Sequence, residues 1–350
     1  MPWENVEKIL RPDMNEVHMG VMKVDESKCN KCGLCIENCP FRAWEKDAND
    51  IPVMKEKYEC FSCFNCKVAC PNDAIMIVDT YHVDGGYWKT EDVPLPAKMP
   101  LEPKDELGNP AEWTNVEKLV FNRRSVRNFK DKPVPEHIIQ RILEAGRFAP
   151  TGGNCQPWKF VVITDKELLS QISKETYKIL DFMFKSYIDD NLVKTLVPII
   201  EGPPFEPGRV DPRVILGGMG TVSRVGEEAV TLNAPALILI FGDVRAISGI
   251  DINIGICGQN MNLVAMSLGV GVCWNGFIAN AIDNLRPIQR KLKIKKPWKC
   301  ITSLCLGYPR FKQEGVVPRE YRPVTWFREG AAGPEVQQQD ITIKDVKEKA

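Results

Sequence analysis

Two copies of one cysteine pattern dominate the first part of this 350-residue chain. Each copy reads Cys-x₂-Cys-x₂-Cys-x₃-Cys-Pro, and the spacing is the same in both. The eight cysteines are Cys29, Cys32, Cys35, Cys39, Cys60, Cys63, Cys66 and Cys70. Three cysteines at intervals of three wrap a short loop around one inorganic centre, so a fourth thiolate has to come from elsewhere. Pro40 and Pro71 prevent a helix from continuing beyond the fourth cysteine of each copy.

Zinc sites are the main alternative to iron–sulfur clusters, because Cys-x₂-Cys pairs also bind zinc. Two identical runs of four cysteines, each ending in Cys-Pro, fit the usual paired zinc arrangement poorly and favour clusters. A disulfide framework is less favoured still, because the N-terminus lacks the pattern of a secretory signal. The remaining cysteines have no ligand spacing and indicate small buried side chains: Cys155, Cys257, Cys273, Cys300 and Cys305.

The paired motifs resemble those of bacterial two-cluster ferredoxins, in which the fourth cysteine of each motif ligates the other motif's cluster. The resemblance implies two 4Fe–4S clusters with crossed ligands. One cluster would be held by Cys29, Cys32, Cys35 and Cys70, and the other by Cys60, Cys63, Cys66 and Cys39. Two flanking segments, residues 21–25 and 74–79, are predicted to be short strands that pair with each other.

Composition suggests how the chain is organised into domains. We expect a ferredoxin domain over residues 1–82, a proline-rich linker over 83–112, a larger domain over 113–328 and a polar C-terminal tail over 329–350. Within the larger domain, residues 181–233 contain clusters of glycine and proline. These clusters predict an irregular insertion.

Hydrophobic periodicity indicates both helices and buried strands in the larger domain. Helices are predicted from Asn115 onward, over 136–148 and over 254–268. Strands are predicted over 158–163, 236–241 and 301–306. Helices that alternate with buried strands indicate an α+β core, which would follow the small ferredoxin-like domain.

The charge of the chain is unevenly distributed, although the net charge is zero. Residues 1–112 carry 21 acidic and 13 basic side chains, and the remainder carries the opposite excess. The two parts could dock on each other, the basic part could bind a phosphate-bearing cofactor, or the pattern could be ordinary solvated charge. No basic run interleaved with aromatic residues supports nucleic-acid binding. The longest apolar run, 236–241, is too short to span a bilayer, and oxygen-sensitive clusters suggest a reducing cytoplasm.

Residues 122–129 form the most distinctive motif outside the cysteine repeats. They place three arginines and a serine within five positions, which could bind a phosphate group; alone, such a run also suits a solvated helix end. Further motifs follow in the order 149–158, 269–277, 306–309 and 318–319. In this order the segments resemble the nitroreductase family of FMN-dependent reductases, over roughly residues 113–328. The resemblance implies an α+β sandwich that forms a homodimer, with FMN bound at the subunit interface.

The resemblance also implies roles for the arginine motif. Arg123 and Ser125 would hold the FMN phosphate, assisted by Arg319. Arg127 would lie near the N1/O2 edge of the flavin ring, where positive charge stabilises the anionic reduced form. Arg124 would contact the flavin or its ribityl chain.

Two further segments are implied to contact the flavin. The first is a loop, part of which would reach across from the partner subunit: Pro150, Thr151, Gly152, Asn154 and Gln156. The second is a turn at Asn275 and Gly276, whose backbone N–H groups would face flavin N5 and O4. The helix over 254–268 corresponds to the family's central dimer helix, although simple core burial would give the same pattern. The loop is richer in glycine than in many relatives, so its individual hydrogen bonds are not implied.

Other classes of enzyme are poorly supported. No Gly-x-Gly-x-x-Gly follows a strand, and residues 217–220 lack that spacing, which argues against a dedicated dinucleotide-binding domain. The chain has three histidines, His18, His82 and His137, and none lies beside an obvious nucleophile. Ordinary structural roles are therefore predicted for them. No side chain is predicted to be catalytic, since the flavin would carry the chemistry.

Together these patterns predict an iron–sulfur flavoprotein oxidoreductase. Electrons would pass from a low-potential, ferredoxin-like donor through two clusters to FMN, and then to a small organic acceptor. The acceptor could contain a nitro group, an activated C=C bond, a quinone or a carbon–halogen bond. Two alternatives stay open: an electron-transfer subunit whose FMN serves a partner enzyme, and the reverse reaction, in which substrate oxidation reduces ferredoxin.

Overall fold

The computed structural model describes residues 13–91, 95–96, 102–189, 211–247, 249–312, 315–320, 322–330 and 333–337. The chain forms two compact units. Unit 1 comprises Met1–Asn122, Pro207–Asp211 and Gln313–Ala350, and unit 2 comprises Arg123–Glu206 and Pro212–Lys312. No helix in the described part of the chain is both long and apolar enough to cross a membrane.

The cysteine-bearing part of unit 1 is built from short strands that pair in antiparallel fashion. The pairs are β1 (Val17–His18) with β6 (His82–Val83), β2 (Val21–Val24) with β5 (Ile75–Asp79), and β3 (Trp44–Lys46) with β4 (Pro52–Met54). A short helix overlaps each cysteine motif: α2 (Leu34–Glu37) and α3 (Asn65–Ala69). The predicted pairing of the two flanking segments is confirmed by β2 and β5, with Val24 opposite Ile75.

Unit 1 also contains the 3₁₀ turn η1 (Met14–Glu16), helix α4 (Asn115–Asn122) and the strand pair β11 (Val324–Trp326) and β12 (Glu335–Gln337). Thr114 and Glu117 begin α4 with a reciprocal capping box, since the Thr114 N–H donates to Glu117 Oε2 at 2.7 Å and the Glu117 N–H donates to Thr114 Oγ1 at 3.2 Å. The predicted helix is therefore confirmed. Its apolar residues are not buried within the chain, however, and Val116 is 68% exposed. The tail is not wholly loose, because β12 lies within it; residues 338–350 lie outside the described part.

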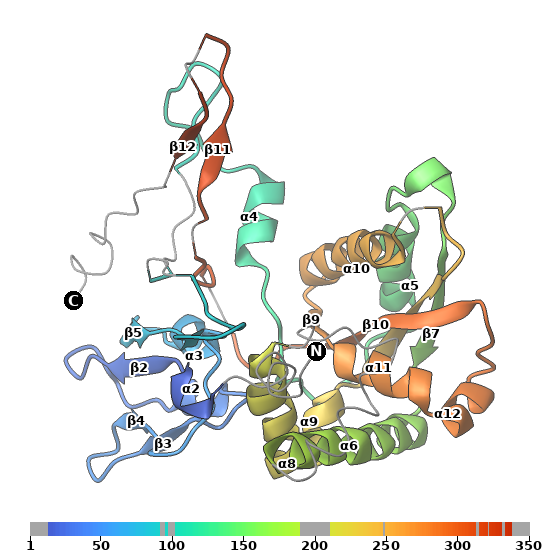
Figure 1. Ribbon diagram of the computed structural model, residues 1–350, viewed down its shortest axis with the longest axis horizontal. Helices are drawn as coiled ribbons and strands as arrows, with labels where there is room; N and C mark the ends of the chain where they lie inside the picture. Colours follow the sequence, from blue (N-terminus) through green and yellow to red (C-terminus); the bar gives the residue numbers. More distant parts are fainter. Residues whose placement is uncertain are drawn as a thin grey trace. The chain divides into compact units, whose positions relative to one another are not determined.

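Unit 2 is organised around a four-stranded antiparallel sheet with the order β7-β8-β10-β9 (Figure 1). The strands are β7 (Trp158–Ile163), β8 (Ala236–Asp243), β9 (Gly271–Trp274) and β10 (Trp298–Gly307). The three predicted strands are confirmed as β7, β8 and β10. Strand β8 is almost entirely buried, as expected of a strand covered on both faces.

Helices cover both faces of this sheet. One face packs against α5 (Glu136–Arg147) and α10 (Ile250–Ser267), and both helices were predicted. The opposite face packs against α6 (Lys166–Ile188), α8 (Gly220–Val225), α9 (Glu228–Thr231), α11 (Gly276–Asn284) and α12 (Arg286–Lys291). The alternation along β8 separates the two cores: Leu237 and Leu239 face the second group, and Ile238 and Ile240 the first. This arrangement agrees with the predicted α+β sandwich.

The prediction of an irregular insertion over 181–233 is wrong for most of the segment that the structure describes. Helix α6 continues to Ile188, and a π-helical segment, η3 (Val214–Met219), leads into α8. The glycines there permit close packing: a Cβ on Gly218 would lie 2.7 Å from the Phe277 ring. Gly217 to Gly220 are therefore helical and do not break the structure. Residues 190–210, including the Gly–Pro cluster at 202–208, lie outside the described residues.

Candidate functional site

The two cysteine loops share one unusual backbone conformation. Left-handed residues, which are uncommon outside glycine, occur at corresponding positions of the two motifs. The corresponding pairs, with their φ angles, are Lys31 (58°) and Ser62 (61°), Gly33 (75°) and Phe64 (57°), and Arg42 (51°) and Asp73 (50°). Even where one motif has glycine and the other phenylalanine, the chain turns in the same way. The sequence repeat is therefore also a structural repeat.

Backbone hydrogen bonds to sulfur follow the same repeat. The Ala43 N–H donates to Cys39 Sγ at 3.4 Å, and the Ala74 N–H donates to Cys70 Sγ at 3.2 Å. The acceptors are the fourth cysteines of the two motifs. Hydrogen bonds of this kind favour a thiolate ligand and tune a bound cluster.

Each fourth cysteine lies beside the other motif. Burial raises the pKa of the Cys35 thiol to about 12, and Cys70 adds to the effect. Burial likewise raises the pKa of Cys60 to about 12, with Cys63 and Cys39 adding to it. Cys70 therefore neighbours the first motif and Cys39 the second, which is the arrangement that crossed ligation requires. Neighbouring thiolates of this kind are soft donors that fit an iron–sulfur cluster. The number of clusters and the individual ligand assignments stay a prediction.

The arginine motif is held against the edge of the sheet in unit 2. The Val126 N–H donates to the Val272 carbonyl of β9 at 3.0 Å. Gly271 allows this approach, because a Cβ there would lie 2.8 Å from Val126. The Arg127 guanidinium lies beside Cys273; burial raises the pKa of that thiol, and Arg127 partly offsets the rise. The sequence therefore fixes the register of the motif along β9.

The side chains of the motif differ in their exposure. Arg124 is buried, whereas Arg123, Ser125 and Arg127 are half-buried. A half-buried guanidinium next to a hydroxyl can form hydrogen bonds with a phosphate while it stays partly desolvated. Arg319 is exposed and belongs to unit 1. Its role beside Arg123 stays a prediction.

The turn at Asn275 begins helix α11. The side-chain Oδ1 of Asn275 accepts from the Ile278 N–H at 3.3 Å, and Nδ2 donates to the Val230 carbonyl at 2.6 Å. The Asn275 backbone N–H donates to the Ser303 carbonyl at 2.8 Å. Because of this last bond, the Asn275 N–H is not available to a flavin, and of the two predicted residues only Gly276 keeps the expected role. The Gly276 N–H lies at the first helical position and has no acceptor within the helix.

The loop over 150–156 lies at the far end of the sheet from the arginine motif. The 3₁₀ turn η2 (Gly152–Asn154) leads into β7, whose first residue, Trp158, pairs with Gly242 of β8. Val272 of β9 pairs with Leu306 of β10, and Leu306 pairs with Ala236, which lies at the opposite end of β8 from Gly242. Six residues of strand correspond to about 20 Å. Within one chain, therefore, Arg123–Arg127 lie close to β9, but the loop over 150–156 does not lie close to Arg123–Arg127.

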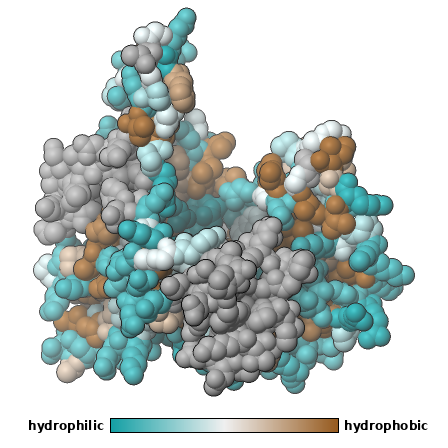
Figure 2. Space-filling view, viewed as in Figure 1, coloured by the Kyte–Doolittle hydropathy of each residue, from teal (hydrophilic) through white to brown (hydrophobic). Residues whose placement is uncertain are grey.

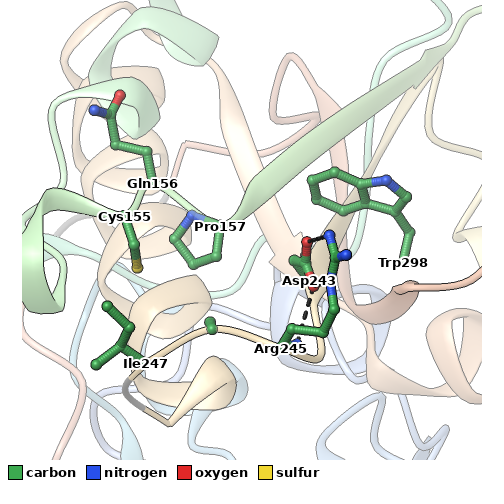
Figure 3. A pocket seen from close by; sticks show the side chains of 8 residues that line it. Cys155, Gln156, Pro157, Asp243, Arg245, Ile247 and Trp298 are labelled. Carbon is green, nitrogen blue, oxygen red and sulfur yellow. Dashed lines mark hydrogen bonds and ion pairs between the residues drawn. The ribbon is translucent and has the colours of Figure 1, made fainter.

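A cavity of about 450 Å³ lies beside this loop, within unit 2 (Figure 3). Its lining residues are Cys155, Gln156, Pro157, Asp243, Arg245, Ala246, Ile247 and Trp298. Arg245 donates to both Asp243 oxygens, at 2.9 and 2.6 Å, and these bonds hold the pKa of Asp243 at about 2. The pair is visible beside Trp298 in Figure 3. The charges at the mouth of the cavity therefore largely satisfy each other.

Comparisons with known proteins agree with a division of the chain into a cysteine-bearing part and a larger part that follows it. The 4Fe–4S binding domain model matches residues 22–45, which include the first cysteine motif. A putative NADH dehydrogenase/NAD(P)H nitroreductase from Archaeoglobus fulgidus is 40% identical over 57 residues, which are 16% of this chain and 33% of that protein. A protein of the same description from Methanothermobacter thermautotrophicus is 25% identical over 198 residues, which are 56% of this chain and 78% of that protein. The chain thus spans only a third of the length of the first relative.

The chain also has limited similarity to solved structures. A nitroreductase with bound FMN from Desulfitobacterium hafniense has a TM-score of 0.44 and 22% identity, over 59% of this chain and 96% of that one. The Nitroreductase family model itself matches residues 120–308, more than half of the chain. The predicted combination of a nitroreductase-like module with a 4Fe–4S domain is therefore confirmed: the chain belongs to the nitroreductase family.

Proposed function

We propose that this chain is an iron–sulfur flavoprotein oxidoreductase that moves electrons from a low-potential, ferredoxin-like donor to a small organic acceptor. One observation carries the proposal: a chain of the nitroreductase family also contains two cysteine loops with the same backbone conformation. When bound, 4Fe–4S clusters supply one-electron transfer and FMN supplies two-electron chemistry. A chain with both can convert single electrons into pairs.

The cysteine loops would each hold one 4Fe–4S cluster, with Cys39 and Cys70 exchanged between them. The position of Cys70 beside Cys35, and of Cys39 beside Cys60, supports this exchange. The surrounding apolar side chains include Met22, which is 2% exposed and packs in the same core as the cysteines. Such a shell limits solvent access to the ligands and so helps to set the reduction potential.

The arginine motif would hold the FMN phosphate through Arg123 and Ser125, assisted by Arg319. Arg127, fixed beside β9, would place positive charge near the flavin ring, where it favours added negative charge. The N–H of Gly276 would point toward the same ring from the start of α11. Arg124, which is buried, would orient its neighbours or contact the ribityl chain.

A second copy of the chain would complete the flavin site. The loop residues Pro150, Thr151, Gly152, Asn154 and Gln156 lie at the far end of the sheet, so a partner subunit would have to supply them. Helix α10 supports this arrangement, because it is apolar around its circumference but covered on one side only. Ile252 and Ile256 of α10 are 67% and 37% exposed, and Phe148 at the end of α5 is 71% exposed. Figure 2 shows apolar surface over these helices. An apolar face of this kind favours association.

The acceptor would be a nitro compound, an activated alkene, a quinone or an organohalide, and the protein would work in a reducing cytoplasm. An anaerobic count of iron, sulfide and FMN tests the cofactors, and we expect about eight iron atoms and one FMN per chain. Rapid mixing then tests the donor. Reduced ferredoxin should bleach the flavin absorbance, while NADH should do so slowly. Rapid bleaching by NADH in a variant that lacks the clusters would contradict the proposed donor.

A screen of acceptors completes the test. Turnover of a small acceptor with reduced ferredoxin supports the enzyme. No turnover of any acceptor, combined with fast flavin reduction, would indicate an electron-transfer subunit. Reduction of ferredoxin by an organic substrate would indicate the reverse reaction.

A further inference from the structure

Two of the chain's three histidines lie face to face in unit 1, although 63 residues separate them in sequence (between positions 18 and 82). His18 of β1 pairs directly with His82 of β6, and their rings stack with centroids 4.5 Å apart and an interplanar angle of 14°. Asp84 follows on the same face of β6. Its carboxylate reaches both rings: His18 Nε2 lies 2.8 Å from Oδ2, and His82 Nε2 lies 3.5 Å from Oδ1. The ligand-type atoms of all three residues lie within 4.8 Å of one another.

The second nitrogen of His82 already has acceptors. Nδ1 lies 2.9 Å from the Thr80 carbonyl oxygen and 3.6 Å from Asp79 Oδ1. A carbonyl oxygen can only accept, so Nδ1 carries the proton and Nε2 of the neutral ring presents a lone pair. That lone pair faces a carboxylate oxygen of Asp84, which is also an acceptor. Two acceptors face each other here, and a cation between them removes the conflict.

This arrangement is the one that metal-binding histidines usually have. A ligating imidazole generally donates its other N–H to a backbone carbonyl or a carboxylate, which fixes the ring and its tautomer. His82 has both kinds of partner. A protonated imidazole would also satisfy the contact, but an exposed ion pair of that kind contributes little stability.

A further carboxylate is close at hand. Glu16 is the last residue of the 3₁₀ turn η1 and directly precedes β1. The Asp84 N–H donates to the Glu16 carbonyl at 3.0 Å, which continues the β1–β6 ladder. A Cβ on Gly85 would lie 2.5 Å from Glu16 Oε1, so the absence of a side chain at position 85 leaves room for this carboxylate.

We propose that His18, His82 and Asp84 bind a divalent transition-metal ion, with Zn²⁺ as the best match. Two imidazoles and one or two carboxylates are a ligand set that suits zinc and its neighbours, and hard cations such as Mg²⁺ prefer all-oxygen sites. The ion would join β1 to β6. The end of this ribbon beyond His18 and His82 contacts the second cysteine loop through both strands: the Gly20 N–H donates to the Cys60 carbonyl at 2.7 Å, and the Tyr81 N–H donates to Ser62 Oγ at 2.8 Å. The site therefore braces the two strands that flank this loop, independently of the flavin.

The test uses the full-length protein, purified without oxygen and equilibrated with micromolar Zn²⁺. Elemental analysis should find about one zinc per chain in addition to iron. X-ray absorption at the zinc edge should show nitrogen and oxygen neighbours at about 2.0 Å. The double variant His18→Ala/His82→Ala should bind zinc at least tenfold more weakly, and Asp84→Asn should also weaken binding while preserving the shape of the side chain. The matched control is His137→Ala, which removes the third, exposed histidine from α5.

Iron content and flavin absorbance should be unchanged in all of these variants, which shows that they fold. If the double variant folds poorly, the zinc affinity of Asp84→Asn decides whether the site exists. Equal zinc affinity in Asp84→Asn and the parent would overturn the site. So would zinc with sulfur neighbours at about 2.3 Å, which would indicate binding by cluster cysteines. Absence of zinc at micromolar concentration would leave only a hydrogen-bonded histidine pair and would also overturn it.

Discussion

The cysteine loops and the segments that we expect to bind flavin differ in how much of a site one chain can assemble. Unit 1 brings Cys70 beside Cys35 of the first motif and Cys39 beside Cys60 of the second. Unit 2 separates its segments: Arg123–Arg127 lie along β9, and the loop before β7 lies about 20 Å away along the sheet. If the proposed cofactors bind, the first site would be complete within the chain and the second would require a second copy.

This difference follows from the distances over which the residues act. The cysteines of a motif are three residues apart, so local turns alone converge them, and each loop has its left-handed residues at corresponding positions. The segments that we expect to bind flavin depend on the strand order β7-β8-β10-β9, which places β7 and β9 at opposite edges of the sheet, and on the register, which separates them along the strands. A substitution in a cysteine loop should therefore act within one chain, whereas a substitution on α10 should act between chains.

The largest effect is expected for Cys39→Ala. If the motifs exchange their fourth ligands, this variant should lose the cluster held mainly by Cys60, Cys63 and Cys66, and about half of the iron. Iron analysis and EPR of the reduced protein measure the loss. Cys155→Ala is the matched control and should keep all the iron. Loss of only the first motif's EPR signal would show that the ligands are not exchanged.

A large effect is also expected for Ile252→Glu on α10. A carboxylate placed in an apolar interface is desolvated without a partner, so association should weaken by about 3 kcal/mol or more. FMN should be lost together with the dimer, since the partner's loop completes its site. Sedimentation and flavin content measure both. Leu107→Glu, at a residue that is 81% exposed in unit 1, should change neither. A monomer that retains its FMN would show that one chain is enough to form the flavin site, so that the two regions do not differ in this respect.

Much of the fold follows from periodicity in the sequence. The buried strands β7, β8 and β10 and the helices α5 and α10 have strong patterns because both faces of the sheet are covered. Strand β9 is only four residues long and is followed at once by α11, so its pattern is too short to detect. The glycines at 217–220 indicate a break, but the segment is helical and Gly218 packs closely against Phe277, a contact that is invisible in the sequence.

The candidate sites were predictable to different degrees. The spacing of the cysteines determines the ligand loops almost completely. The arginine motif can be found from its charge, but its register along β9 depends on Gly271 and the contact with Val126. The pairing of His18 with His82 could not be foreseen, because two-residue strands have no periodicity. Two histidines separated by most of a domain carry no ligand spacing.

A moderate effect is expected for Arg123→Ala. Loss of one charged hydrogen-bonding partner of the FMN phosphate should cost about 2 kcal/mol or more, which corresponds to roughly a thirtyfold weaker affinity. Fluorescence titration of FMN measures the change. Arg141→Ala, on the exposed side of α5, removes the same charge elsewhere and should leave the affinity unchanged. Iron content should be the same in both variants, because the cysteine motifs belong to unit 1 and both substitutions to unit 2. Equal FMN affinity in the two variants would remove Arg123 from the site.

The smallest effect is expected from two glycines of α10 that differ only in what surrounds them. A Cβ on Gly258 would lie 2.4 Å from the Trp274 ring, whereas a Cβ on Gly255 would meet nothing within 4 Å. Gly258→Ala should therefore lower the free energy of unfolding by about 1–3 kcal/mol through overpacking against β9. Gly255→Ala should be neutral or raise it by about 0.5–1 kcal/mol, because alanine favours a helix more than glycine does. Denaturant unfolding of both variants measures the contrast. If Gly255→Ala instead weakens association while the folded chain keeps its stability, Gly255 lies in the surface that contacts the second copy. One turn of α10 would then contain both a residue that acts within its own chain, Gly258, and a residue that acts between chains, Gly255.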